Sequence, residues 1–517
     1  MKKIYILSTM LAMVAVSCKK SFIELAPPDS LSVSTFYKTE AQLRQAVIAA
    51  YVPLRDLVNN DYFLCEMRSD NTHYQTYASN RGTAYVQREN ISDWVDDPTN
   101  SYTNGEYFNC YTGISRINIV IQSIPDVTLT TAAKNDIDGQ AKFLRAFYYF
   151  KLVRLYGAVP LFLKEVVKAE DAFLPRTTVD SVYAQIVSDA KDAVSELSAP
   201  AKFPQSGQAT KGAATMLLAD IYMTQKKYPE AEALLTTLPA MGYALNANYA
   251  DAFLTTNKNS KESLFEVQYL EGTAAGTQPS NFIYQFLPRT GNTALVTLVT
   301  GTAVNTAAIG GWNTPTQDLI SSYEAGDKRL DASIGVAEGA YNTSDLLTIS
   351  ANKSIVGYTP AAGKVGVPYA KKYLHTPHVV VNNTNDNWPI YRYSDALLLL
   401  AEAQNEQAKS GPALTNLNLV RARAGLAASA VTDQTNLRTI IAHERRVELA
   451  FENHRWHDLV RTGTAITVMT TYGIKAKATY SLLPSNAFTI TNDRLLFPIP
   501  QSERETNPAL TQNTGYF

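Results

Sequence analysis

The chain has 517 residues, which is enough to bury a large core and would allow about two to four domains. Its 46 basic and 47 acidic residues give a formal net charge of -1, which excludes the electrostatic footprint of a nucleic-acid-binding protein or of one that binds an acidic membrane surface. A neutral partner fits this charge better than a polyanion, and the 30 tyrosines suit partly wet binding surfaces.

The N-terminal segment has the layout of a bacterial export signal. Lysines near the start precede an apolar stretch over residues 4–16, which is shorter than the roughly 20 residues needed to cross a bilayer. Cys18 then follows the small residue Ser17, as in a lipobox, where the thiol receives a diacylglycerol. We therefore predict a lipoprotein signal peptide over residues 1–17 and a lipid tether at Cys18. The alternative is an ordinary signal peptide with a chance cysteine.

Helical patterns dominate the rest of the chain and clear strand patterns are few, so the predicted fold class is mainly α. The stretch "FLRAFYYFKLVRLYGAVPL", residues 143–161, is apolar on nearly every face. This pattern predicts a buried helix that ends at Gly157, with Pro160 just beyond it.

Two segments have the spacing of tetratricopeptide helix pairs, in which small residues let two antiparallel helices approach closely. In the first segment the spaced residues are Leu218, Ala219, Tyr222, Ala231 and Leu235. In the second segment they are Leu400, Ala401, Ala413 and Leu417. A generic helical hairpin could explain either copy alone, but the pair predicts a helical-repeat scaffold.

Two stretches lack periodicity and contain aromatic residues. They cover residues 271–315, rich in Gly, Thr and Asn, and residues 381–389, "VNNTNDNWP", and we interpret both as functional loops. Further on, "HERRVELAFENHRWHDLVRTG", residues 443–463, predicts one helix with a stop signal at Gly463. Trp456 lies inside this helix and is predicted to be a core residue.

These segments resemble, in order, the recurring blocks of the SusD/RagB-like family of outer-membrane nutrient-binding lipoproteins. The lipobox, the 143–161 helix, "YRYSDALLLLAEAQNE" and the closing "LFPIPQSERETNPALTQNTGY" all contribute to the resemblance. It implies a scaffold of tetratricopeptide-like helix pairs with loop insertions that carry the ligand site. Within it we expect an N-terminal region over residues 18–240 and a C-terminal region over residues 241–517.

The resemblance also implies a function. A lipid-anchored protein of the outer membrane, facing the cell surface, would capture oligosaccharides and deliver them to a TonB-dependent, SusC-like β-barrel transporter. It implies neither catalysis nor a cofactor. The RagB branch of the family is associated with peptide uptake, so an oligopeptide ligand is the alternative.

A sugar ring needs a flat aromatic side chain for its C–H faces and short polar side chains for its hydroxyl rim. Trp94 and Trp312 both lie among polar residues, in the two regions where the resemblance places glycan contacts. Their alternative role is to fill the scaffold beneath a loop. The candidate rim contacts are Arg68, Asp70, Asn71, Tyr74 and Arg81 in the early region and Asn281, Tyr284 and Arg289 in the mid-chain loop.

A secreted glycoside hydrolase is the rival hypothesis, and it would need two carboxylates across a cleft, one of them with a raised pKa. Asp96 and Asp97 lie in a turn, and the group Glu324, Asp327 and Asp331 reads as solvated charges at a helix end. His454 and His457 share a helical face without a third ligand for zinc, so no metal site is predicted. Whether Cys65 and Cys110 form a disulfide is left open.

Overall fold

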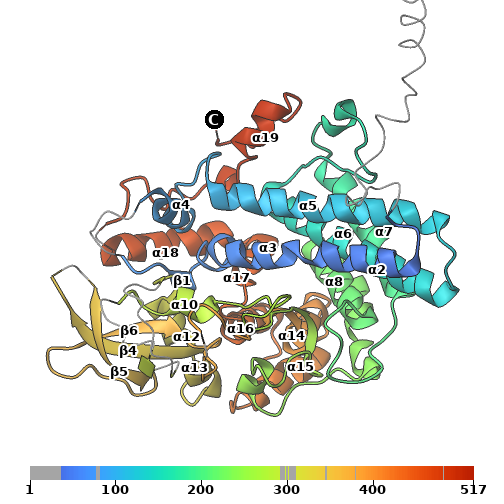
Figure 1. Ribbon diagram of the computed structural model, residues 1–517. Helices are drawn as coiled ribbons and strands as arrows, with labels where there is room; N and C mark the ends of the chain where they lie inside the picture. Colours follow the sequence, from blue (N-terminus) through green and yellow to red (C-terminus); the bar gives the residue numbers. More distant parts are fainter. Residues whose placement is uncertain are drawn as a thin grey trace, which may run out of the picture.

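The computed structural model describes residues 36–516 except residues 77–81, 291–296, 299–300, 302–309, 344–345, 379 and 481. The fold class is mainly α, as predicted (Figure 1). The predicted signal peptide, Cys18 and Arg81 lie outside the described residues. Within the described part of the chain, no helix is both long and apolar enough to cross a membrane.

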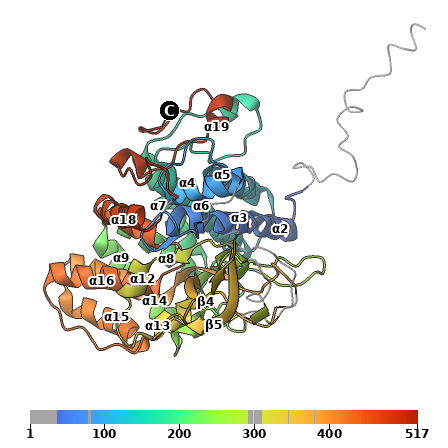
Figure 2. The ribbon, with the colours of Figure 1, turned by 90° about the vertical axis from the view of Figure 1, so that its left-hand side faces the viewer.

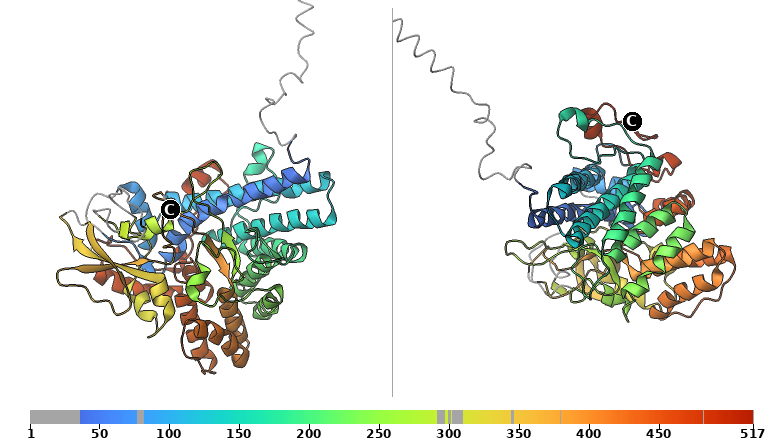
Figure 3. Two further views of the ribbon diagram at one scale, coloured as in Figure 1. Left: turned by 60° about the horizontal axis from the view of Figure 1, so that its bottom comes forward. Right: turned by 90° about the vertical axis from the view of Figure 1, so that its right-hand side faces the viewer.

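The first helices pack on one another in sequence order. α5 (Ser101–Ser123) contacts α2 (Glu40–Tyr51) and α3 (Pro53–Asp61), and it also packs on α6 (Thr131–Tyr156). α6 in turn packs on α7 (Val179–Glu196). Figures 1 and 3 show the α2–α3 run lying along α5 on one side of the molecule.

The predicted buried helix is the C-terminal half of α6. Its start is fixed by Thr130, whose side chain accepts a hydrogen bond from the Ala133 backbone N–H. From Phe143 to Tyr156 every residue except Arg154 is buried. Gly157 follows with φ 72°, a conformation that favours glycine, so the predicted helix and its stop signal are confirmed.

Both predicted helix pairs are present. α8 (Lys211–Thr224) packs on α9 (Tyr228–Leu235), and α14 (Tyr393–Glu406) packs on α15 (Ser410–Arg423). The small residues Ala219, Ala231, Ala401 and Ala413 are all fully buried. α14 also contacts α9 and α16 (Gln434–Glu448), which joins the two pairs into one scaffold (Figure 2).

The remaining helices are short or lie at the edge of the scaffold. In the described part of the chain these α-helices are α4 (Thr83–Ser92), α10 (Phe282–Phe286), α12 (Gln317–Ser322), α13 (Lys328–Ser333), α17 (Arg455–Arg461), α18 (Ala465–Thr479) and α19 (Gln501–Thr506), and a π-helix covers Tyr62–Glu66 besides short 3-10 turns.

Among the described residues the strands form three small antiparallel sheets. The largest has the order β5 (Leu347–Ser354), β4 (Ile334–Tyr341), β6 (Val365–Ala370), and it packs on α10 through a small separate core. The second pairs β2 (Ser263–Val267) with β7 (Trp388–Arg392). The third pairs β1 (Thr72–His73) with β3 (Thr314–Pro315).

The prediction of one helix over residues 443–463 is wrong, because the chain breaks between α16 and α17. Phe451 and Asn453 have positive φ angles of 67° and 69°. The fully buried carboxylate of Glu66 accepts hydrogen bonds from both of their backbone N–H groups, each at 3.0 Å. In a continuous helix these two N–H groups would donate to backbone carbonyls; here the distant residue Glu66 accepts both bonds and so stabilises the break.

Candidate ligand-binding site

The β1–β3 ladder brings together the two regions that the sequence singles out. Its register pairs Thr72 with Pro315 and His73 with Thr314. The contact continues beyond the ladder, because the Gln75 backbone N–H donates to the Gly311 carbonyl at 2.8 Å. Gly311 has φ +66° and lies against the Gln75 side chain, so a glycine is favoured there. The early and mid-chain regions therefore form one surface.

Trp312 is the centre of an aromatic cluster at this junction. Its ring centre lies 5.5 Å from that of Phe63, 6.3 Å from that of Tyr74 and 5.3 Å from that of Tyr85. Only 2% of Trp312 is exposed, whereas Tyr85 on α4 is half-buried. The expectation that Trp312 offers its ring to solvent is therefore wrong, and its position fits the alternative of a side chain that fills the scaffold. Trp312 supports the cluster from below, and Tyr85 forms part of its outer surface.

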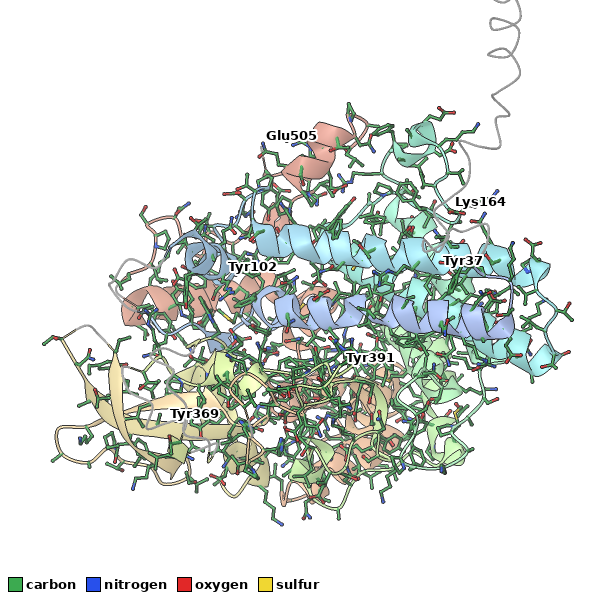
Figure 4. All side chains as sticks on the ribbon, viewed as in Figure 1. Tyr37, Tyr102, Lys164, Tyr369, Tyr391 and Glu505 are labelled. Carbon is green, nitrogen blue, oxygen red and sulfur yellow. The ribbon has the colours of Figure 1, made fainter. Side chains whose placement is uncertain are left out.

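Two arginines complete the outer surface. The Arg88 guanidinium lies 5.1 Å from the Trp312 ring centre and 5.7 Å from that of Tyr85, and its Nε donates to the Tyr102 hydroxyl at 2.5 Å. The Arg289 guanidinium lies 5.7 Å from the Tyr85 ring centre. Both arginines are half-buried. Tyr102, labelled in Figure 4, lies where the N-terminal end of α5 meets α4.

We call this outer surface, formed by Gln75, Tyr85, Arg88, Tyr102 and Arg289, the Trp312 surface. It combines aromatic rings with guanidinium and amide groups that donate hydrogen bonds. Sequence reasoning found Trp312 and Arg289 but missed Tyr85 and Arg88. The signal that could have found them is their spacing of three residues, which puts both side chains on one face of α4.

Four of the five predicted rim contacts of the early region are among the described residues, and all four lie inside the protein. Arg68 donates to Asp96 Oδ1 at 2.5 Å, and Asp70 accepts from Arg455 Nε at 2.8 Å. The Asn71 side chain donates to Glu66 at 2.9 Å. The Tyr74 hydroxyl donates to Asp93 at 2.8 Å, and these residues are at most 4% exposed. Their expected exposure is wrong, because each polar group satisfies a buried partner.

Trp94 is also buried, with 2% of its surface exposed. The Arg68 guanidinium lies 4.0 Å from its ring centre, and the Trp456 ring lies 5.3 Å away edge to face. The expectation that Trp94 offers a ring to solvent is therefore wrong in this structure, and its position fits the alternative of a scaffold-filling side chain. The prediction that Trp456 is a core residue is confirmed.

The remaining mid-chain candidates are divided between two places. Asn281 is half-buried and precedes α10, while the buried Tyr284 hydroxyl lies 3.2 Å from His378 Nδ1. Only Arg289 joins Trp312. A ligand-contact role for any of these residues remains a prediction.

The acidic groups weighed for catalysis are held in structural contacts. Asp97 accepts a hydrogen bond from the Thr99 backbone N–H at 2.7 Å, and Asp96 pairs with Arg68. Glu324 and Asp331 are exposed ion-pair partners, as predicted. Asp327 is instead buried against Arg329 at 2.8 Å, so its interpretation as a solvated charge is wrong.

The Cys65 Sγ lies 3.4 Å from His457 Nε2, which resembles the cysteine–histidine pair of a nucleophilic enzyme. Burial raises the pKa of the Cys65 thiol well above its ordinary value and lowers the pKa of His457 well below it. Both groups therefore stay neutral, and the pair lacks the thiolate that nucleophilic catalysis requires. Cys65 and Cys110 are free thiols, which resolves the open question of a disulfide. In the described residues no group of three or more His, Cys, Asp or Glu side chains could hold a metal ion.

Comparison with known families identifies the chain. The SusD family matches residues 218–516, and a second family, described as starch-binding associating with outer membrane, matches residues 21–223. The chain therefore belongs to the SusD family, as the resemblance implied.

Individual relatives match this chain over nearly its whole length. SusD-like protein P38 of Formosa agariphila is 27% identical over 97% of this chain and 96% of its own. A solved laminarin binding SusD-like protein has a TM-score of 0.73 and 26% identity, and the match covers 93% of this chain and 100% of that one. Surface glycan-binding protein A from Bacteroides thetaiotaomicron, solved with laminarihexaose, has a TM-score of 0.69 at 23% identity over 92% and 100% of the two chains, which shows the shared fold.

Proposed function

We propose that this protein is a cell-surface glycan-binding lipoprotein that captures oligosaccharides and delivers them to a SusC-like TonB-dependent transporter. The observation that carries the proposal is the Trp312 surface, where the two regions predicted to hold glycan contacts meet across the β1–β3 ladder. The family's association with the outer membrane and the laminarin-binding relative support it.

The chemistry of the Trp312 surface suits a neutral sugar. Tyr85 offers a half-buried ring on which the C–H face of a pyranose can stack. Arg88 and Arg289 stand beside that ring and can donate hydrogen bonds to hydroxyl groups. Trp312, which itself packs against Phe63 and Tyr74, supports the Tyr85 ring from below, and this reduces the entropy lost on binding.

We further propose that the protein binds its ligand without cleaving it. A glycosidase needs one carboxyl group with a raised pKa and a second carboxylate across the same cleft. The Trp312 surface as defined here contains arginines, tyrosines and an amide. Asp96 and Asp97, the carboxylates weighed for catalysis in the turn after Trp94, are held in structural contacts.

Binding to an array that contains neutral oligosaccharides and oligopeptides tests the ligand class. We expect retention of oligosaccharides, whereas retention of peptides alone would overturn the proposal in favour of peptide uptake. For the best sugar, titration calorimetry should show at least a tenfold loss of affinity in Tyr85→Ala, which corresponds to about 1.4 kcal/mol.

The matched control is Tyr341→Ala, because Tyr341 is 49% exposed on β4 and lies outside the Trp312 surface. It should bind as the wild type does. Wild-type affinity in both Tyr85→Ala and Arg88→Ala would contradict the site. Trp94→Ala is a poor probe of contact, since removing this buried ring should lower stability by about 3–5 kcal/mol.

A further inference from the structure

A cavity of about 450 Å³ lies between α12 and α18, next to the β1–β3 ladder. Its walls include Gln317, Asp318 and Ser321 from α12 and Lys475, Ala478 and Tyr480 from α18 and the residue that follows it. None of these side chains belongs to the Trp312 surface. Most are exposed or half-buried, so the cavity is accessible from solvent.

Tyr480 gives this cavity a rigid flat wall. One face of its ring stacks on His73 at a centroid distance of 4.0 Å and an interplanar angle of 9°, and its backbone N–H donates to Ala476 at 2.8 Å. His73 in turn stacks on Tyr74 at 4.2 Å, and Tyr74 contacts Trp312. The ring is therefore fixed before any ligand binds, at the end of an aromatic row that begins at Tyr85.

The polar groups of the cavity balance in charge. Asp318 accepts from Lys475 Nζ at 2.6 Å and from Arg446 Nη1 at 3.0 Å. Although partial burial opposes ionisation, these two cations hold the pKa of Asp318 below its ordinary value. Arg446 also pairs with Asp70 at 2.9 Å. Because two carboxylates balance these two cations, the cavity has no net positive charge to attract a phosphate.

The cavity therefore presents both hydrogen-bond donors and hydrogen-bond acceptors around the flat ring of Tyr480. The Gln317 amide donates to the Ser321 hydroxyl at 3.0 Å, and both side chains are exposed. The carboxylate of Asp318 accepts only, whereas Lys475 donates only. A neutral polyol, whose hydroxyl groups both donate and accept, uses all of these groups at once.

We propose that the cavity between α12 and α18 is a second carbohydrate subsite, in which Tyr480 stacks on a sugar ring while Asp318, Gln317 and Lys475 bind its hydroxyl groups. This inference rests on the proposed function, since it extends oligosaccharide binding beyond the Trp312 surface. A glycan of several units would bind more tightly than a short one because it contacts both places.

The test fills the cavity without touching its stacked rings. Ala478 is exposed and lines the cavity, so Ala478→Trp should occupy it. Lys477→Trp is the matched control, because the neighbouring Lys477 is exposed on the same helix and does not line the cavity. Calorimetry with maltohexaose, laminarihexaose, cellohexaose and xylohexaose identifies the hexasaccharide that binds the wild type, and its disaccharide serves as the short probe.

We expect Ala478→Trp to weaken hexasaccharide binding at least fivefold and Lys477→Trp to leave it unchanged, with equal thermal midpoints for both variants. Equal hexasaccharide affinity in the two variants would overturn the second subsite while a loss in Tyr85→Ala would still support the proposed function. Failure of all four hexasaccharides to bind the wild type would overturn both proposals. Asp318→Asn should reproduce the effect of Ala478→Trp in part.

Discussion

At the scale of single residues, Glu448 shows how much of the scaffold depends on buried charge. Its fully buried carboxylate lies 3.1 Å from Arg329 and 3.0 Å from Arg392, and it also pairs with Arg423. Glu448→Gln would leave three buried guanidinium groups with one carboxylate fewer. We expect it to lower the free energy of unfolding by about 3–5 kcal/mol, measured by urea denaturation.

The same residue gives a pH dependence. Burial opposes ionisation, but the guanidiniums of Arg423, Arg392 and Arg329 hold the pKa of Glu448 well below its ordinary value of 4.5. A carboxyl group whose pKa is depressed by folding stabilises the protein above that ordinary value and loses this contribution as the pH falls below it. The loss of stability between about pH 5 and pH 3 should therefore be smaller in Glu448→Gln.

A surface ion pair provides the control for Glu448. Glu406 pairs with Arg438 at 2.6 Å, but the Arg438 side chain is 44% exposed. Glu406→Gln should change stability by at most about 1 kcal/mol. Equal free energies of unfolding in Glu448→Gln and Glu406→Gln would show that the buried ion pairs of Glu448 stabilise the fold no more than a surface pair does.

At the scale of elements, the turn between α16 and α17 depends on Glu66. Its carboxylate accepts from the Phe451 and Asn453 backbone N–H groups. Glu66→Ala removes both acceptors and leaves buried donors unpaired, each at a cost of about 1–3 kcal/mol. We expect faster amide hydrogen exchange at Phe451 and Asn453, measured by mass spectrometry.

Glu66→Gln is the conservative companion. It keeps one carbonyl oxygen as an acceptor, so exchange at these two amides should increase less than in Glu66→Ala. Exchange rates that match the wild type in both variants would show that the turn forms without Glu66.

The contrast between this turn and the helix pairs shows what the sequence can predict. Ala219 and Ala231 are encoded within one short segment, so their spacing predicts the pair that they form. The turn cannot be found in this way. The residue that stabilises it, Glu66, lies 385 positions before Phe451, and local periodicity through the break still favours a helix.

The candidate site shows the same difference between features that local sequence encodes and features that depend on distant contacts. The residue types around Trp312 and Arg289 indicate a polar aromatic surface, and the structure places both residues in one cluster. For Trp94 the neighbouring residues are equally polar, yet its ring is covered by Arg68 and Trp456. Exposure depends on contacts across the fold, so the expectation of a solvent-facing ring is wrong for both tryptophans, each of which is 2% exposed; Trp312 differs only in lying beneath the half-buried ring of Tyr85.

At the scale of the whole molecule, the first helices and both tetratricopeptide-like pairs share one core. One hydrophobic core extends from Leu43 on α2 to Leu510 near the C-terminus and includes residues of both tetratricopeptide-like pairs. The predicted lipid at Cys18 would attach the protein to a membrane, because each buried CH₂ of a lipid chain contributes about 0.8 kcal/mol.

Replacing the predicted lipid acceptor tests this attachment directly. In the full-length precursor, Cys18→Ser should abolish incorporation of labelled palmitate and move the protein from the outer-membrane fraction to the soluble fraction. Cys110→Ala is the matched control, because Cys110 is a free but buried thiol and its replacement should change neither result. If the Cys18→Ser protein stayed in the membrane fraction after a high-salt wash, attachment would have to come from a protein partner, and co-purification of a β-barrel transporter with this variant would identify it.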